Sequence, residues 1–195
     1  MALSQSGGIP AEEKQKAVDE AIAMARLSLE IHSQLHGPES SEAAGDMALL
    51  ADVLGCFNDV DDEITRLYEQ ALAIYARVQG HNSVNVAINT SNLGVEYFKK
   101  ATRALHANDL DRYVANLELA VLNYREAATI HRANNHMDRA YRNERMATET
   151  EALLRHRTTQ KARAAAAAAA ATTAATSAKA ATAKAAAATP LMESK

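Results

Sequence analysis

Apolar side chains recur every three or four positions through six stretches of the chain, and short polar or glycine-containing segments separate these stretches. This recurrence matches the period of an amphipathic α-helix. It predicts helices over about 10–36, 41–56, 61–79, 110–134 and 137–157, and a long one that opens within 81–85 and reaches about 106. Because the connections are short, we expect six helices paired as three antiparallel hairpins.

The residues at the helix ends support these limits. Pro10 suits the first position of a helix, where its missing N–H is not needed. Gly37 and Gly80 are typical of the position that follows a helix. The apolar stripes predict a shared core that includes Val18, Ile22, Ala25, Leu29, Leu35, Met47, Leu50, Ala51, Leu54, Ile64, Leu67, Tyr68, Ala71, Leu72, Val78, Val86, Ile88, Leu93, Tyr97, Leu105, Leu117, Val121, Tyr124, Ala128, Ala140, Met146, Ala147, Leu153 and Leu154.

The helical stretches form an internal repeat. "LEIHSQLHG" begins at Leu29 and "LAIYARVQG" begins at Leu72, and a shift of 43 lays 19–37 on 62–80 with five identities in nineteen. The same shift relates the helices that follow. A third copy needs a shift of 56, and longer fourth and fifth helices would absorb the 13 additional residues. One helix pair cannot bury its apolar stripe alone, whereas stacked pairs bury a continuous core.

The best-preserved part of the repeat resembles tetratricopeptide repeats of the kinesin-light-chain type. The matching motifs are Ala71-Leu72-Ala73-Ile74, Gly80, Val86-Ala87 and Asn92-Leu93-Gly94-Val95-Glu96-Tyr97, within a resemblance over roughly 19–150. The resemblance implies an all-α fold, a short right-handed α-solenoid of about three antiparallel helix hairpins. It also implies a protein–protein interaction module.

Composition agrees with an all-α protein. Trp is absent, aromatic residues make up 4%, and only three Pro and seven Gly interrupt the chain. A single cysteine, Cys56, cannot form an intramolecular disulfide, which indicates a reducing compartment and predicts a cytoplasmic protein. The N-terminus lacks the basic and apolar regions of a signal peptide, and no apolar run is long enough for a membrane span.

Composition and charge also divide the chain. We expect a disordered N-terminus over 1–9, a repeat domain over 10–157 and an Ala-rich, low-complexity tail over 158–195. The tail carries a net charge of +4 and the remainder −7, and an acidic body argues against a nucleic-acid partner except through sparse contacts of the tail. The Ala run could extend the last helix, while Thr and Ser beyond Thr172 favour a flexible appendage; both alternatives stay open.

No motif predicts catalysis or a metal site. His32 and His36 have the spacing of a two-histidine ligand face, but no Glu lies between them as in zinc proteases. The acidic segment 59–63 lacks the length and the central Gly of a calcium loop. Cys56 has no partner pattern and lies near a helix C-terminus, where a thiolate is not favoured. We therefore expect no cofactor, no metal and no enzymatic activity.

By resemblance, the first helix of each hairpin lines a concave face that holds a segment of a protein or peptide partner. The residues expected there are Asp52, Ser91, Asn92, Val95, Glu144, Arg145 and Thr148. A bond of Asn92 within the superhelix is an equally acceptable role for that side chain. The alternative function is a structural subunit of a larger assembly, with oligomer contacts through the outer face of the first helix.

Overall fold

The computed structural model describes residues 10–57 and 61–187, with side chains for all of these except 57, 61 and 177–187. The predicted disordered segment 1–9 lies outside the described residues. All regular structure in the described part is helical, in the order α1 (Ala11–His36), α2 (Ser41–Phe57), α3 (Asp61–Gln79), α4 (Val84–His106), α5 (Leu110–Ala133) and α6 (Met137–Ala187). The predicted all-α class is confirmed.

The limits of five helices agree with the periodicity to within one or two residues, but α6 does not end near 157 as predicted. It continues to Ala187 through the Ala-rich run. Ala has the highest helix propensity of all residues, so the backbone stays helical without large side chains to pack. Of the two alternatives for the tail, the helical one therefore describes the segment as far as Ala187.

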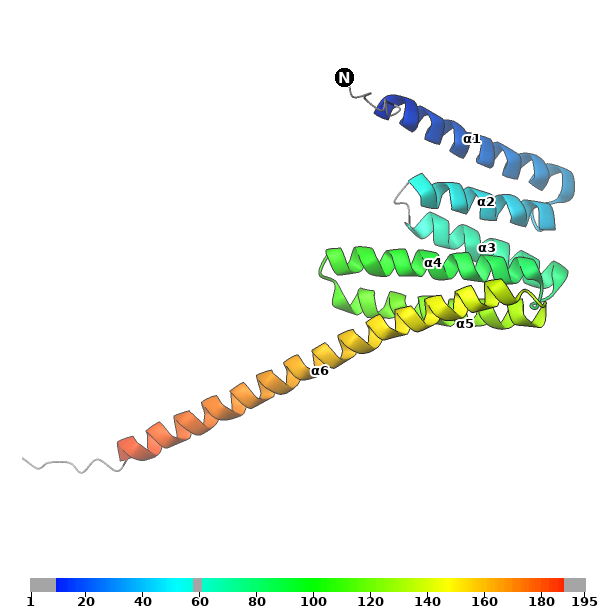
Figure 1. Cartoon of the computed structure of the whole chain (residues 1–195). Helices are drawn as coiled ribbons and strands as arrows, with labels where there is room; N and C mark the ends of the chain where they lie inside the picture. Colours follow the sequence, from blue (N-terminus) through cyan, green and yellow to red (C-terminus); the bar gives the residue numbers. More distant parts are fainter. Residues whose placement is uncertain (1–9, 58–60, 188–195) are drawn as a thin grey trace, which may run out of the picture. The chain divides into compact units, whose positions relative to one another are not determined.

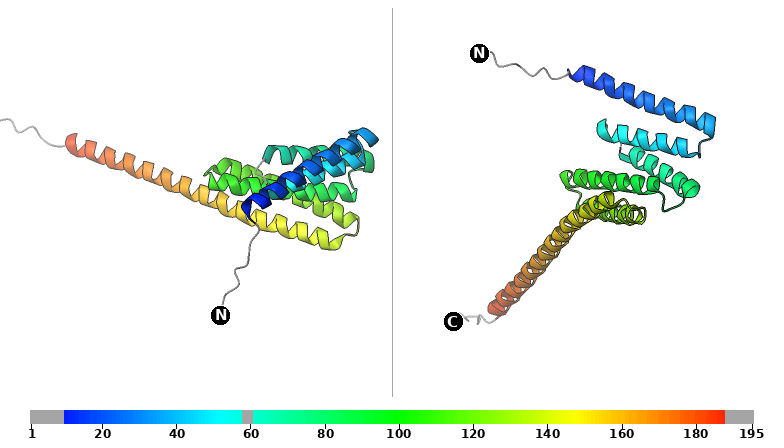
Figure 2. Two further views of the ribbon diagram at one scale, coloured as in Figure 1. Left: turned by 90° about the horizontal axis from the view of Figure 1, so that it is seen from above. Right: turned by 45° about the vertical axis from the view of Figure 1, so that its right-hand side comes forward.

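The chain divides into two units, Met1–Glu151 and Ala152–Lys195, and α6 contributes to both. In the first unit, α1 to α5 pack in chain order, each helix against the next. Figures 1 and 2 show this stack of consecutive helices. The first unit is thus a short α-solenoid, while the predicted domain limit at 157 stays a prediction.

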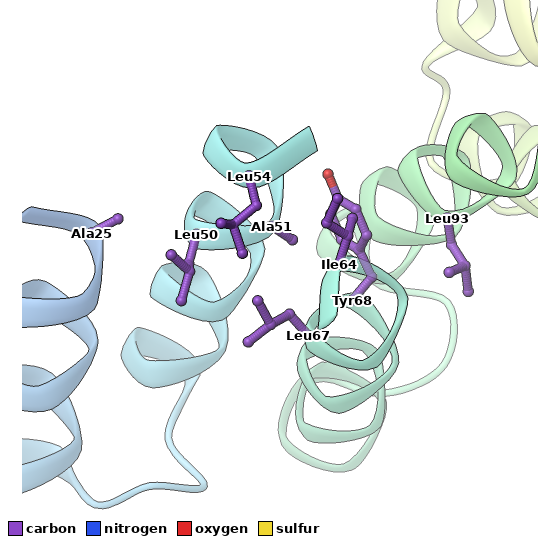
Figure 3. Close-up of a cluster of buried hydrophobic side chains, with 8 residues drawn as sticks. All are labelled: Ala25, Leu50, Ala51, Leu54, Ile64, Leu67, Tyr68 and Leu93. Carbon is purple, nitrogen blue, oxygen red and sulfur yellow. The ribbon is translucent and has the colours of Figure 1, made fainter. Parts of the chain in front are cut away.

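A continuous core runs through the stack. One cluster joins Ala25 of α1, residues of α2 and α3, and Leu93 of α4, as Figure 3 shows. A second cluster joins α2 to α5, from Ala44 to Ile130. A third joins Ala120 and Tyr124 of α5 to Ala147 in α6. From α2 to α5, each helix therefore buries apolar residues against both of its neighbours, as the repeat predicts, whereas α1 packs against α2.

Three predicted core residues of the first unit are instead exposed: Leu35 at 70%, Val78 at 53% and Leu105 at 39%. Each is the last residue but one of its helix. The apolar period therefore continues into the final turn, where these side chains are not covered. Leu153, which belongs to the second unit, is also exposed.

The turns repeat as well. Gly37 and Gly80 have φ of 92° and 88°, a conformation that L side chains rarely adopt. Ser83 follows Gly80, and its Oγ accepts a hydrogen bond from the N–H of Val86 to start α4. The third copy lacks the Gly, and Asn135 takes a positive φ of 61° there. Asn tolerates this region better than other side chains, which explains how the turn survives without Gly.

Candidate protein-binding face

Hydrogen bonds join α2, α4 and α6, which are alternate helices of the chain, side by side. Asn92 Nδ2 of α4 donates to Asp52 Oδ1 of α2 over 3.2 Å. Ser91 Oγ of α4 donates to Asn143 Oδ1 of α6 over 2.8 Å. Because adjacent residues of α4 reach in opposite directions, α2, α4 and the 137–151 part of α6 form one surface. We call this surface the α2–α4–α6 face.

Asp52 is the acceptor at the centre of the α2 side of this face. The Tyr68 hydroxyl donates to Asp52 Oδ1, the same oxygen that accepts from Asn92. Burial and the hydrogen bond to Asp52 raise the pKa of Tyr68. The phenol therefore keeps its proton and remains a donor. The role of Asn92 within the superhelix, which the sequence left open, is thus present in the structure.

The α2 side of the face contains a hollow of about 190 Å³. Its charged members are Asp52, the buried Glu96, and Lys99, whose Nζ lies 2.6 Å from Glu96 Oε1. Lys99 Nζ also donates to the carbonyl of Gly55 over 3.1 Å. Lys99 therefore offsets the charge of Glu96, while the Asp52 carboxylate accepts hydrogen bonds from the neutral side chains of Tyr68 and Asn92. It consists of Asp52, Cys56, Tyr68, Asn92, Val95, Glu96 and Lys99.

The α6 side of the face contains a second hollow, also of about 190 Å³. Arg139 and Arg142 contribute exposed guanidinium groups to it, and Asn143 is held by its bond from Ser91 and by its own bond to the carbonyl of Arg139. The lining consists of Ile88, Ser91, Asn92, His131, Arg139, Arg142 and Asn143. This end of the face is therefore basic.

His131 lies at the base of the second hollow and is 2% exposed. Its Nδ1 atom is buried and has no hydrogen-bond partner. Burial, with the positive charges of Arg139 and His136, lowers the pKa of His131. The imidazole is therefore neutral at pH 7, and the positive charge of the hollow comes from the arginines.

The structure brings four of the predicted residues together: Asp52, Ser91, Asn92 and Val95 all line one or both hollows. The other three do not line either one. Glu144 forms an ion pair with Arg132 of α5. Arg145 pairs with Glu149 along α6 at 3.6 Å, and Thr148 donates to the carbonyl of Glu144.

The sequence did not identify Ile88, His131, Arg139, Arg142 and Asn143 as members of the face. The repeat register places Glu144 beside Ser91, but the hydrogen bond reaches Asn143. Neighbouring helices touch through residues that point toward each other, whereas repeat-equivalent residues point in parallel directions. A search for donors and acceptors one position or one turn away from the equivalent position would have found Asn143 and Arg142.

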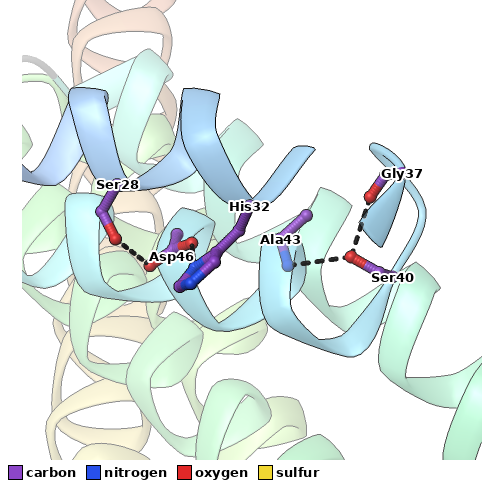
Figure 4. Close-up of polar contacts among 6 residues, drawn as sticks. All are labelled: Ser28, His32, Gly37, Ser40, Ala43 and Asp46. Atoms are coloured by element: carbon purple, nitrogen blue, oxygen red, sulfur yellow. Dashed lines mark hydrogen bonds and ion pairs between the residues drawn. The ribbon is translucent and has the colours of Figure 1, made fainter. Parts of the chain in front are cut away.

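A second polar cluster joins α1 to α2, as Figure 4 shows. Asp46 accepts from Ser28 Oγ over 2.8 Å, and His32 Nδ1 lies 2.6 Å from the other carboxylate oxygen. Ser, His and Asp recur in hydrolases, but there the histidine bridges the serine and the carboxylate. Here the carboxylate bridges the other two, so the cluster binds helix to helix and activates no nucleophile.

The described part of the chain contains neither a group of metal ligands nor a helix that could cross a membrane. Among the described residues, no three His, Cys, Asp or Glu side chains lie close enough together to hold a metal ion. Of the acidic segment 59–63, residues 59 and 60 lie outside the description. Within the described ranges, no helix combines the length and apolar character that crossing a membrane requires.

No protein-family model and no curated protein matches the chain. Among solved structures, the chain is similar to the crystal structure of BtubC (BKLC) from P. vanneervenii, with 20% sequence identity and a TM-score of 0.44. The similarity covers 73% of this chain and 60% of that chain, so this chain spans less than two thirds of that protein's length. Membership of the kinesin-light-chain type stays a prediction.

Proposed function

We propose that this protein is a non-enzymatic interaction module that holds a segment of a partner protein on the α2–α4–α6 face. The observation that carries the proposal is the position of Asn92. Its side chain belongs to both hollows of the face, so the two hollows adjoin and can hold one continuous segment. A cytoplasmic location and the absence of a cofactor remain predictions beside it.

The chemistry of the face suits an extended segment better than a compact small molecule. Both hollows are open and modest in volume, and each offers donors and acceptors from different helices. Backbone N–H and C=O groups of an extended segment need such partners at regular intervals. Rigid helices already hold the donors and acceptors of the two hollows in place before a partner binds. Binding therefore requires little loss of conformational entropy from these side chains.

The test compares partner capture by three tagged forms of the full chain expressed in the native cell. We expect the double variant Asn92→Ala with Arg142→Ala to recover the partner at least about tenfold less than wild type, because both hollows lose a polar anchor. The measurement is affinity purification with quantitative mass spectrometry. Circular dichroism melting of the purified variant checks that the fold is intact.

Arg145→Ala is the matched control. Arg145 is one turn from Arg142 on the same helix, is exposed, and pairs only along α6 with Glu149 among the contacts described. Recovery by this variant should equal that of wild type. Equal recovery by all three forms would remove the α2–α4–α6 face as the binding surface.

A further inference from the structure

The outer side of α1 carries a stripe of exposed apolar residues. Met24 is 73% exposed, Leu27 55%, Ile31 44% and Leu35 70%. Steps of three, four and four residues place them on one face of the helix. Ala25, the buried residue of α1 among those described, lies on another face of the helix and packs against α2. We refer to Met24, Leu27, Ile31 and Leu35 as the α1 stripe.

The internal repeat shows what covers such a face elsewhere in the molecule. The shift of 43 lays Met24 on Leu67 and Ile31 on Ile74 of α3. Leu67 is only 7% exposed and Ile74 only 8%, because α2 packs on them. Figure 3 shows Leu67 directed from α3 toward the Leu50 side of α2. The same shift lays Leu27 on Gln70 and Leu35 on Val78, which are both exposed on α3, so the comparison applies to Met24 and Ile31. Their equivalents on α3 are covered by α2, whereas the described residues place no helix over them on α1.

The covering helix has a defined chemistry. Around Leu67 and Ile74, α2 contributes small side chains that allow close approach and leucines that fill the space between them: Ala44, Leu50, Ala51 and Leu54. At these two equivalent positions the α1 stripe offers a similar surface, with Met24 and Ile31 in place of Leu67 and Ile74. An occupant of the α1 stripe would continue the interface that already runs from α1 through α5.

The charge around the stripe narrows the choice of occupant. Glu13 and Glu20 continue the line of the stripe toward the N-terminus, and Glu30 lies beside it; all three are exposed. Two basic side chains, Lys14 and Lys16, accompany them on α1, and Lys16 pairs with Glu20 at 3.9 Å, so the acidic groups remain in excess. A second copy of α1 would bring acidic groups against acidic groups. Lys and Arg side chains flanking an apolar seam would complement them.

We propose that the α1 stripe binds an amphipathic helix of a partner protein, one whose seam of Ala and Leu is flanked by Lys or Arg. The partner helix takes the position on α1 that α2 takes on α3 and extends the stack by one element. This surface is separate from the α2–α4–α6 face, so the two proposals stand or fall independently.

The test uses the full chain and a labelled synthetic probe. The probe is the 17-residue sequence of α2 with Glu42, Asp46 and Asp52 changed to Lys and Cys56 to Ser. Fluorescence anisotropy should show saturable binding that weakens as salt increases. The same peptide with its native acidic residues should bind at least about tenfold more weakly.

Variants of the full chain locate the site. Met24→Gln with Ile31→Gln should weaken binding of the basic probe by at least about tenfold. Both residues are exposed, so the fold should survive. Leu122→Gln, which alters a 62% exposed leucine on α5, should bind like wild type.

Three outcomes would overturn the proposal. The first is no binding of the basic probe by wild type. The second is equal binding by the Met24→Gln, Ile31→Gln variant. The third is a concentration-dependent dimer of the full chain in light scattering that this double variant abolishes, because the occupant would then be a second copy.

Discussion

At the residue scale, the tightest constraint is at Gly94 of α4. A Cβ atom there would lie 2.9 Å from two ring carbons of Tyr124 and 3.3 Å from Asn123 Cβ. Tyr124 is itself almost fully buried, at 1% exposure, so its ring has little room to move. The glycine in the "NLG" motif therefore serves the approach of α5 to α4 rather than any backbone conformation.

Replacing Gly94 with Ala should lower the free energy of unfolding by about 1–3 kcal/mol, because the new methyl group overpacks the α4–α5 contact. Denaturant titration followed by circular dichroism measures this. Gly45→Ala is the matched control, since a Cβ there meets only the hydroxyl oxygen of Tyr75 at 3.2 Å. A Gly94→Ala variant as stable as Gly45→Ala would contradict the close approach.

His131 predicts a pH dependence of stability. Its pKa is lowered in the folded protein by burial and by Arg139 and His136, so between its folded and unfolded pKa values the unfolded chain binds more protons. The stability that neutral His131 contributes is therefore fully present above the ordinary histidine pKa of about 6.5. It decreases as the pH falls below that value and is lost once the pH falls through the lower pKa of His131 in the folded protein.

We expect the melting temperature to fall between pH 7.5 and 5.5, and the fall to be smaller in His131→Gln. His81→Gln serves as the control, because His81 is exposed. Equal pH profiles for wild type and His131→Gln would rule out His131 as the source.

At the element scale, α1 is the most weakly attached helix of the first unit. Ala25 is its one buried residue among those described, with Ile22 and Leu29 partly buried beside it. The polar cluster around Asp46 supplies a further link, since Ser28 and His32 of α1 both bond to that carboxylate. Asp46 is 7% exposed, so losing it would leave two polar partners at a largely closed contact.

Asp46→Ala should destabilise the α1–α2 contact by about 1–3 kcal/mol. Hydrogen exchange with mass spectrometry should show faster exchange across 11–36, with α4 and α5 unchanged. Asp19→Ala is the control, because Asp19 is exposed and bonds only to Gln15 along α1 among the contacts described. Unchanged exchange in α1 after the loss of Asp46 would show that apolar contacts alone attach this helix.

At the scale of the whole first unit, packing is between neighbours in chain order. Leu50 belongs to the cluster of α1 to α4, whereas Leu117 is a fully buried residue of α5. In such a stack, stability is close to a sum of local terms and interfaces between adjacent elements. Damage at one end should therefore not spread equally to the other.

Leu50→Ala and Leu117→Ala should each cost about 2–5 kcal/mol, because each leaves a cavity in a packed core. Hydrogen exchange should rise most in α1 to α3 for the first variant and most in α4 and α5 for the second. The same uniform rise for both variants would instead indicate one fully cooperative unit.

Local sequence determined the elements of this protein. Helical periodicity and the glycines at the turns, Gly37 and Gly80, predicted six helices because these signals act over a few residues. The 43-residue repeat predicted that the helices stack as successive copies of one unit. Tertiary structure decided which side chains meet: Asn92 with Asp52, Ser91 with Asn143, and Asp46 with two residues of α1. Tertiary structure also decided where burial stops, at Leu35 and along the α1 stripe. Contacts between helices depend on their relative rotation and length of overlap, and the repeat pattern does not encode either quantity residue by residue.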